Sequence, residues 1–256
     1  MTKYLILIVI SIIAATKNTN GQILPPIQLD RPDQTECPFI TPKGFIQVEN
    51  GFTIENVNKS QKSYSYPSSL WKYGVSKNVE LRLITELKTE KNEVNSISGI
   101  SPITIGFKAK LLEEKGIIPK TSFIGHINTS KIGSKQFQSN SILPSFRFTM
   151  QHTLTQKITV AYNLGAEWND ENVDFIYTLT SGFSLTEKLG FYAELYGFVP
   201  NDISSNHRCD GGFTYLVNDN LIFDFSGGYG LTNNAPQNYI SLGVSYRFNT
   251  EFTNNK

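Results

Sequence analysis

Apolar and polar residues alternate at every second position through most of this chain, and this pattern restricts it to β-strands. In residues 103–111 the odd positions are Ile, Ile, Phe, Ala and Leu, whereas Thr104, Gly106, Lys108 and Lys110 occupy the even ones. A period of two is the signature of a strand with one apolar face. About twelve such segments follow one another, at 45–55, 64–75, 79–87, 103–111, 118–127, 142–152, 158–166, 174–183, 189–199, 207–217, 221–229 and 240–248.

The connections between these segments alternate between short and long. Tight turns occupy 75–79, 154–158, 185–189 and 217–221, and a slightly longer turn occupies 113–118. The other connections are longer and more polar, among them 88–101 and 128–140. Tight turns at one end of a sheet and loops at the other are typical of outer-membrane β-barrels.

A soluble β-sandwich or lipocalin-like barrel has the same alternation, because the pattern does not say which face points inward. The strand number favours a transmembrane barrel, since a small barrel with a dry core uses fewer strands. Aromatic residues also fall near segment ends, where an interfacial girdle would lie: Trp71, Tyr73, Phe148, Tyr177, Phe183, Tyr229, Tyr246 and Phe248. We therefore expect an all-β fold, a single antiparallel transmembrane β-barrel of about twelve strands at 44–248.

Residues 1–21 have the layout of a secretory signal peptide. Lys3 precedes an apolar run from Tyr4 to Ala15, and small polar residues follow it. The run is shorter than the roughly 20 residues that a membrane-spanning helix needs. Cleavage after Ala15 and cleavage after Gly21 both fit. The leader predicts export, with the bacterial outer membrane as the destination and 249–256 as a C-terminal tail.

Charged residues of both signs lie on the polar face of the segments. If the apolar face meets lipid, the polar face lines the lumen, and the near balance of signs does not favour strong ion selectivity. The charges either line a pore for polar solutes or neutralise one another in a filled barrel. The permeation candidates are Glu49, Glu80, Arg82, Glu86, Lys108, Lys110, Arg147, Glu167, Glu194, Arg208, Asp210, Asp224 and Arg247.

Residues 22–43 precede the first expected strand and are predicted to lie on the periplasmic side. Their sequence at 30–36, DRPDQTE, is dense in charge and is followed by further prolines. We predict that this segment enters the lumen as a plug through Arg31, Asp33 and Glu36, and that deleting 30–43 raises conductance. The alternative is a periplasmic tail without a role.

Other chemistry has little support in the sequence. An exported chain could pair Cys37 with Cys209, but their spacing does not show that they meet. No metal pattern or cofactor motif is present. His126, His152 and His207 lie outside any nucleophile-and-base pattern, so we do not expect an enzyme. The net charge of +1 argues against a nucleic-acid partner.

Three stretches carry a family resemblance: RPDQTECPFITPKGFIQVENGF, SLWKYGVSKNVELRL and GISPITIGFKAKL. Together they resemble the meta-pathway of phenol degradation family of outer-membrane barrels, over essentially the whole mature chain. The resemblance implies an outer-membrane location and a transport role, but no residue here specifies an aromatic solute. Two departures are Cys37 and the eight residues after Phe248, which displace the usual terminal aromatic.

The sequence thus predicts a porin-like outer-membrane channel or passive transporter for small molecules, including hydrophobic or aromatic ones. Its expected partners are outer-membrane lipid, a small-molecule solute and, during biogenesis, the barrel-assembly machinery. The alternative is a closed barrel that acts as a binding or structural protein through its surface loops.

Overall fold

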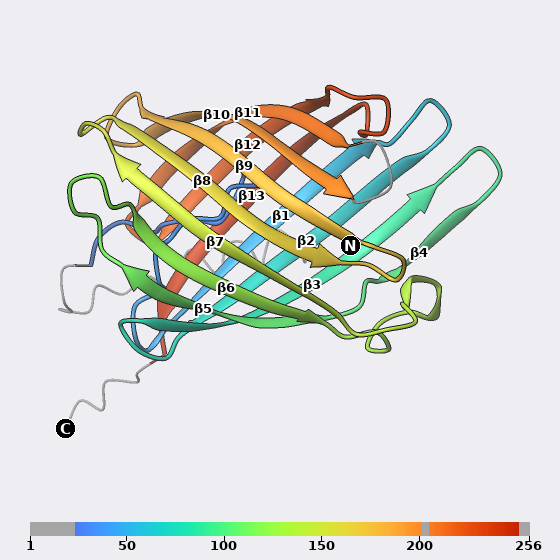
Figure 1. The fold of residues 1–256 in the computed structure, drawn as a ribbon, viewed down its shortest axis with the longest axis horizontal. Helices are drawn as coiled ribbons and strands as arrows, with labels where there is room; N and C mark the ends of the chain where they lie inside the picture. The colour runs from blue at the N-terminus through green and yellow to red at the C-terminus, as the bar shows by residue number, and fades with distance from the viewer. Residues whose placement is uncertain (1–23, 201–204, 251–256) are drawn as a thin grey trace, which may run out of the picture.

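The computed structural model describes residues 24–200 and 205–250 as a closed β-barrel with its N-terminal stretch running inside (Figure 1). The expected leader and most of the C-terminal tail lie outside the described residues. The strands are β1 (Phe45–Asn56), β2 (Lys62–Gly74), β3 (Val79–Lys91), β4 (Ser96–Ile100), β5 (Thr104–Leu112), β6 (Lys120–Asn128), β7 (Leu143–Thr153), β8 (Ile158–Trp168), β9 (Val173–Ser184), β10 (Leu189–Pro200), β11 (Asn206–Asn218), β12 (Leu221–Gly230) and β13 (Asn238–Asn249).

All strands pair antiparallel, and the pairing of β1 with β13 closes the sheet. The closing register runs from Phe45 opposite Asn249 to Asn56 opposite Asn238. β4 and β5 share one position in the ring, because both pair with β3, β5 at its first half and β4 at its second. The thirteen described strands therefore fill twelve positions, which confirms the expected fold.

The connection at 88–101 differs from the expected polar loop. β3 continues to Lys91, and β4 pairs with it from Leu87 opposite Ile100 to Lys91 opposite Ser96. The loop proper is therefore short, and this hairpin projects beyond the rest of the rim (Figure 1). The chain between β4 and β5 is tied down by the backbone N–H of Ile103, which donates to the carbonyl of Ile132 at 2.9 Å. That carbonyl belongs to the long β6–β7 connection, which contains the short 3₁₀ turn η1 (Lys135–Phe137).

The barrel exposes apolar side chains on its outer face and buries polar side chains inside, the reverse of the arrangement in a soluble protein. On β12, Phe223 and Phe225 are 49% and 48% exposed, whereas Asp224 and Ser226 between and beside them are 4% and 0% exposed. The same alternation of exposed apolar and buried polar side chains runs through the other strands. Aqueous solvent cannot favour such a surface, so the apolar outer face is suited to lipid. None of the helical structure in the described residues has the length and hydropathy needed to cross a bilayer.

The prolines of β2 and β7 lie where a strand can accommodate them, in a bulge and near a strand end. Pro67 lies in a β-bulge, where the register shifts between Ser65 and Ser68. Pro144 is the second residue of β7. Proline cannot donate to a ladder hydrogen bond, so bulges and strand ends accommodate it.

Candidate functional site: a lumen occupied by the N-terminal segment

Residues 24–43, here called the luminal segment, run from one rim into the barrel and back, and most of them lie inside it (Figure 1). The two ends of the segment lie at the rim that carries the short turns. Arg247 donates to the carbonyl of Pro25 at 2.9 Å, and Ile27 N–H donates to the carbonyl of Asp219 in the β11–β12 turn at 2.9 Å. At the other end, Lys43 forms a bridge to Gly74. The segment is therefore a loop inserted from one rim.

Asp30 is the centre of the first cluster of contacts. Three cations converge on its carboxylate: Lys72 Nζ at 3.0 Å, Arg82 Nη1 at 3.1 Å and Lys108 Nζ at 2.7 Å. All four side chains are at most 2% exposed. Burial alone would raise the pKa of Asp30, but Lys108, Lys72 and Arg82 together hold it well below its usual value. The carboxylate is therefore ionised at ordinary pH.

The three cations form a fixed group on the wall. Lys72 and Arg82 are register partners on β2 and β3, and Lys108 on β5 is the partner of Glu80. We call Lys72, Arg82 and Lys108 the basic cluster. Glu49 pairs with Lys72, and Glu80 lies 3.3 Å from Arg82. Because two wall carboxylates face three cations, this part of the wall alone carries one uncompensated positive charge, and Asp30 and Glu36 of the segment face it.

Glu36 makes the second ionic contact between the segment and the wall. It pairs with Arg82 Nη2. Its backbone N–H donates to the Asn163 side-chain oxygen at 2.8 Å, and Asn163 donates back to the Glu36 carbonyl at 3.0 Å. Arg147 donates to the carbonyl of Gln34 at 3.0 Å. Side chains on β3, β7 and β8 thus hold the tip of the segment.

The other side of the lumen offers acceptors instead. Glu194 on β10 accepts the backbone N–H groups of Gln34 and Thr35 at 2.7 and 2.8 Å. Arg31 donates to Asp224 on β12 at 3.1 Å and to Ser241 at 3.0 Å. Asp210 on β11 accepts the hydroxyl of Tyr239. We call Glu194, Asp210 and Asp224 the acidic cluster.

Two members of each cluster face each other across the barrel, Arg82 and Lys108 opposite Glu194 and Asp210, whereas Asp224 on β12 lies three positions from Lys72 on β2. In a ring of twelve positions, six steps separate opposite strands. Following the pairing order, β10 lies six positions from β3, and β11 lies six positions from β5. The luminal segment lies between the two clusters, with Asp30 and Glu36 turned to the basic cluster and Arg31 turned to Asp224. Asp33 is the exception, because it lies near Glu194 and Asp210, which carry the same sign.

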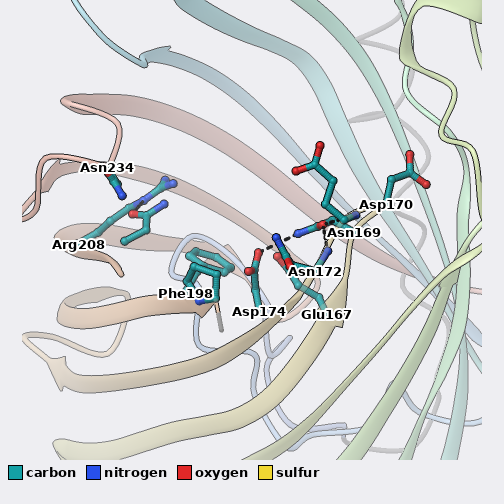
Figure 2. A pocket seen from close by; sticks show the side chains of 11 residues that line it. Glu167, Asn169, Asp170, Asn172, Asp174, Phe198, Arg208 and Asn234 are labelled. Carbon is teal, nitrogen blue, oxygen red and sulfur yellow. Dashed lines mark hydrogen bonds between the residues drawn. The ribbon is translucent and has the colours of Figure 1, made fainter. Parts of the chain in front are cut away.

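The loop end of the barrel holds a cavity of about 800 Å³ (Figure 2). Glu167, Asp174 and the β8–β9 connection form one side of it, and Phe198 and Arg208 form the other. Arg208 is tied to Glu55 at 3.1 Å and lies over the Phe198 ring at 5.7 Å. The cavity makes the outer mouth of the barrel a wide vestibule above the luminal segment.

The predicted permeation candidates all lie on the inner face or at its rims. Eight are buried in the lumen: Glu49, Glu80, Arg82, Lys108, Glu194, Asp210, Asp224 and Arg247. Five are half-buried: Glu86, Lys110, Arg147, Glu167 and Arg208. Lys110 lies toward the short-turn end and pairs with Glu113 at 2.7 Å, and Glu86 accepts the Ser101 hydroxyl at 2.8 Å near the loops. Their roles in permeation stay predictions.

The sequence interpretation missed Asp30, which makes more ionic contacts than Arg31, Asp33 or Glu36. The side chains of Asp30 and its neighbour Arg31 contact different parts of the wall, Asp30 at Lys108 on β5 and Arg31 at Asp224 on β12. It also missed the backbone donors of Gln34 and Thr35. Alternation within DRPDQTE was the available signal, because an extended chain sends neighbouring side chains to opposite sides.

The cysteines and histidines are the other side chains of the described residues that the sequence analysis singled out. Cys37 and Cys209 are both free. His207 Nδ1 lies 2.7 Å from the Tyr177 hydroxyl, and His152 Nε2 lies 3.4 Å from the Tyr162 hydroxyl. His126 Nε2 has no hydrogen-bond partner among the described residues. Within the same residues, no group of acidic, Cys and His side chains is arranged to hold a metal ion.

Gly74 controls how closely the segment approaches the wall. A Cβ there would lie 2.1 Å from the Pro42 carbonyl oxygen and 2.3 Å from that of Thr41. We expect Gly74→Ala to shift this backbone and to speed maleimide labelling of Cys37 several-fold in a Cys209→Ser background. Gly227→Ala on β12, whose Cβ would lie 3.2 Å from its nearest neighbour, is the matched control. Equal labelling rates in both variants would contradict tight docking at Gly74.

Three solved structures share this fold. An outer membrane channel from Pseudomonas putida F1 aligns with a TM-score of 0.62 at 11% identity, covering 90% of this chain and all of that one. The NanC porin aligns at 0.53 with 10% identity, covering 78% and 98% of the two chains. The KdgM porin aligns at 0.51 with 11% identity, covering 79% and 99%. These likenesses establish the fold of outer-membrane barrels.

Sequence comparison adds the family. No curated protein matches this chain. One family profile matches residues 29–248, a range that includes the charged part of the luminal segment and almost the whole barrel. The chain belongs to the family described as "Putative MetA-pathway of phenol degradation".

Proposed function

We propose that this protein is an outer-membrane channel for small molecules, closed in the described state by the luminal segment and opened when that segment leaves. The observation that carries the proposal is the content of the lumen. It is filled by a chain segment held through ion pairs and hydrogen bonds, whereas the wall itself is complete without it. A polar interior of this kind is suited to a water-filled path.

The apolar outer face supports a position in the outer membrane, with lipid as its surroundings and the assembly machinery as a transient partner. The charged wall favours polar solutes over hydrophobic or aromatic ones. Passage of the solute without chemistry is supported by His152 and His207, whose rings contact tyrosine hydroxyls. The test is single-channel conductance of the intact chain beside a chain without residues 30–40. Equal conductance of the two chains would contradict the proposal that the luminal segment is a gate.

A closed barrel that acts through its loops is the second candidate, favoured by the vestibule at the outer mouth. This candidate predicts that neither the intact chain nor the chain without residues 30–40 conducts ions in a planar bilayer, although both remain folded. Heat-dependent gel mobility reports that folding.

The proposed gate predicts a pH dependence centred on Asp33. Burial, followed by repulsion from Glu194 and Asp210, raises the pKa of Asp33 well above its usual 3.8 when the segment is docked. The docked state therefore binds a proton that the released state gives up. Docking is fully favoured below pH 3.8 and weakens as pH rises toward the docked pKa.

We expect the open probability to rise with pH above about 4 in planar bilayers. Asp33→Asn should flatten that rise, because Asn does not titrate. Asp30 should contribute little in this range, since its pKa is lowered and its charge is present throughout. An unchanged pH profile in Asp33→Asn would exclude Asp33 as the titrating group.

A further inference from the structure

The basic cluster is a formed anion site that the luminal segment itself occupies. Four donor contacts within 3.1 Å reach the two oxygens of the Asp30 carboxylate, from Lys72, Arg82 and Lys108. The donors come from three adjacent strands of the closed wall, so their spacing is set by the barrel and not by the segment. Removal of the segment would leave the site in place.

The site keeps its preference for an anion after the segment leaves. Glu49 and Glu80 are the wall carboxylates within ion-pair distance of the cluster, and they offset two of its three cations. The third positive charge needs an external anion. An unpaired buried charge is costly, so the open lumen has reason to bind one.

The geometry of the Asp30 contacts restricts what that anion is. Lys108 Nζ contacts both oxygens of Asp30, at 2.7 and 2.9 Å, while Lys72 and Arg82 both contact Oδ2. A group with two oxygens fixed about one carbon fits these donors, whereas a spherical chloride ion fits fewer of them at once. Asp30 is thus a carboxylate ligand supplied by the chain itself.

We propose that the basic cluster is the solute site of the channel, that it binds small organic carboxylates, and that such a solute competes with Asp30 for the same three donors. The inference rests on the proposed function, because the site becomes available only when the luminal segment leaves. It adds a solute class and a coupling between solute binding and opening. A carboxylate in the lumen displaces the carboxylate that holds the gate.

The first experiment uses the chain without residues 30–40 in planar bilayers, with benzoate as the probe. Benzamide is the matched uncharged probe, and benzylammonium is the matched cation. We expect benzoate to reduce the chloride current saturably at a concentration about tenfold lower than benzamide, the range of a hydrogen bond to a charged group. Benzylammonium should give no saturable block at this site.

Lys108→Gln should abolish the difference between benzoate and benzamide, and Lys157→Gln, in an exposed turn, should leave it intact. Lys72→Gln carries the same expectation if the Lys108 variant does not refold. An open channel whose current responds equally to benzoate and benzamide would overturn the carboxylate site and leave the gate standing. A chain without residues 30–40 that conducts no better than the intact chain would instead overturn the gate.

The second experiment tests competition in the intact chain. In a Cys209→Ser background, benzoate should speed maleimide labelling of Cys37, and benzamide or an equal ionic strength of chloride should not. Acceleration by chloride to the same degree would show simple screening and would overturn a site specific for carboxylates.

Discussion

Removing residues 30–40 is expected to raise the single-channel conductance several-fold while leaving the barrel folded. The deleted residues contribute no strand, and they supply the contacts to Asn163, Glu194 and Asp224 that cross the lumen. Ending the deletion at Ile40 keeps the Pro42 carbonyl, which accepts the N–H of Phe45 at 3.0 Å at the start of β1. A twelve-position barrel leaves a modest lumen once it is emptied.

Conductance in a planar bilayer and heat-dependent gel mobility, measured on the same refolded sample, separate a changed pore from a damaged barrel. Glu171→Gln in the β8–β9 connection is a suitable control, because that side chain lines the cavity at the loop end of the barrel. The segment enters from the opposite, short-turn end. A folded deletion variant with the conductance of the intact chain would contradict the gate.

Replacing Asp30 by Asn is expected to release the segment without deleting any of it. The substitution keeps the shape of the side chain but removes the carboxylate on which all three cations of the basic cluster converge. From the segment, only Glu36 then still pairs with the cluster, at Arg82. Breaking a buried ion pair from one side costs about 3–5 kcal/mol, so the released population should rise about 100-fold or more. Cys37 reports this change, because its backbone N–H donates to Asp30 at 2.9 Å and its thiol moves with the segment.

Maleimide labelling of Cys37 in the Cys209→Ser background measures that release. In the docked state, burial, followed by the nearby Asp30 charge, raises the pKa of the Cys37 thiol to about 12, so little thiolate is present. Asp30→Asn should therefore speed labelling strongly, whereas Asp170→Asn in the outer connection should not. Slow labelling in both variants would mean that Asp30 does not hold the segment.

The barrel was predictable because alternation is a local property. The faces of residues 103–111 and 221–229 follow from neighbouring residues alone, and the short turns follow from their length. The hairpin at 88–101 was misjudged, since its polar composition conceals a ladder that extends above the membrane-facing part of β3.

The arrangement of charge in the lumen was not predictable in the same way. The sequence shows that Lys108 and Glu194 both face inward, but their separation across the barrel depends on how many positions close the ring. The sequence left open whether the charges line a pore or neutralise one another, and the structure shows both local wall pairs, such as Lys72 with Glu49, and the group Glu194 and Asp210 opposite Arg82 and Lys108. The contacts of Asp30 were not predicted for a related reason, because its partners lie 42 to 78 residues away in the chain.

The insertion of the luminal segment from one rim gives the channel a direction. Both ends of the segment leave through the short-turn end, at Pro25 beside Arg247 and at Lys43 beside Gly74. A pull from the short-turn end can draw the segment out as a loop. A force applied from the vestibule would instead have to push the segment along the whole lumen. With the expected orientation, in which the short turns face the periplasm, the proposed gate would be open to a mechanical pull from the periplasm and to chemical competition from a solute entering at the loop end.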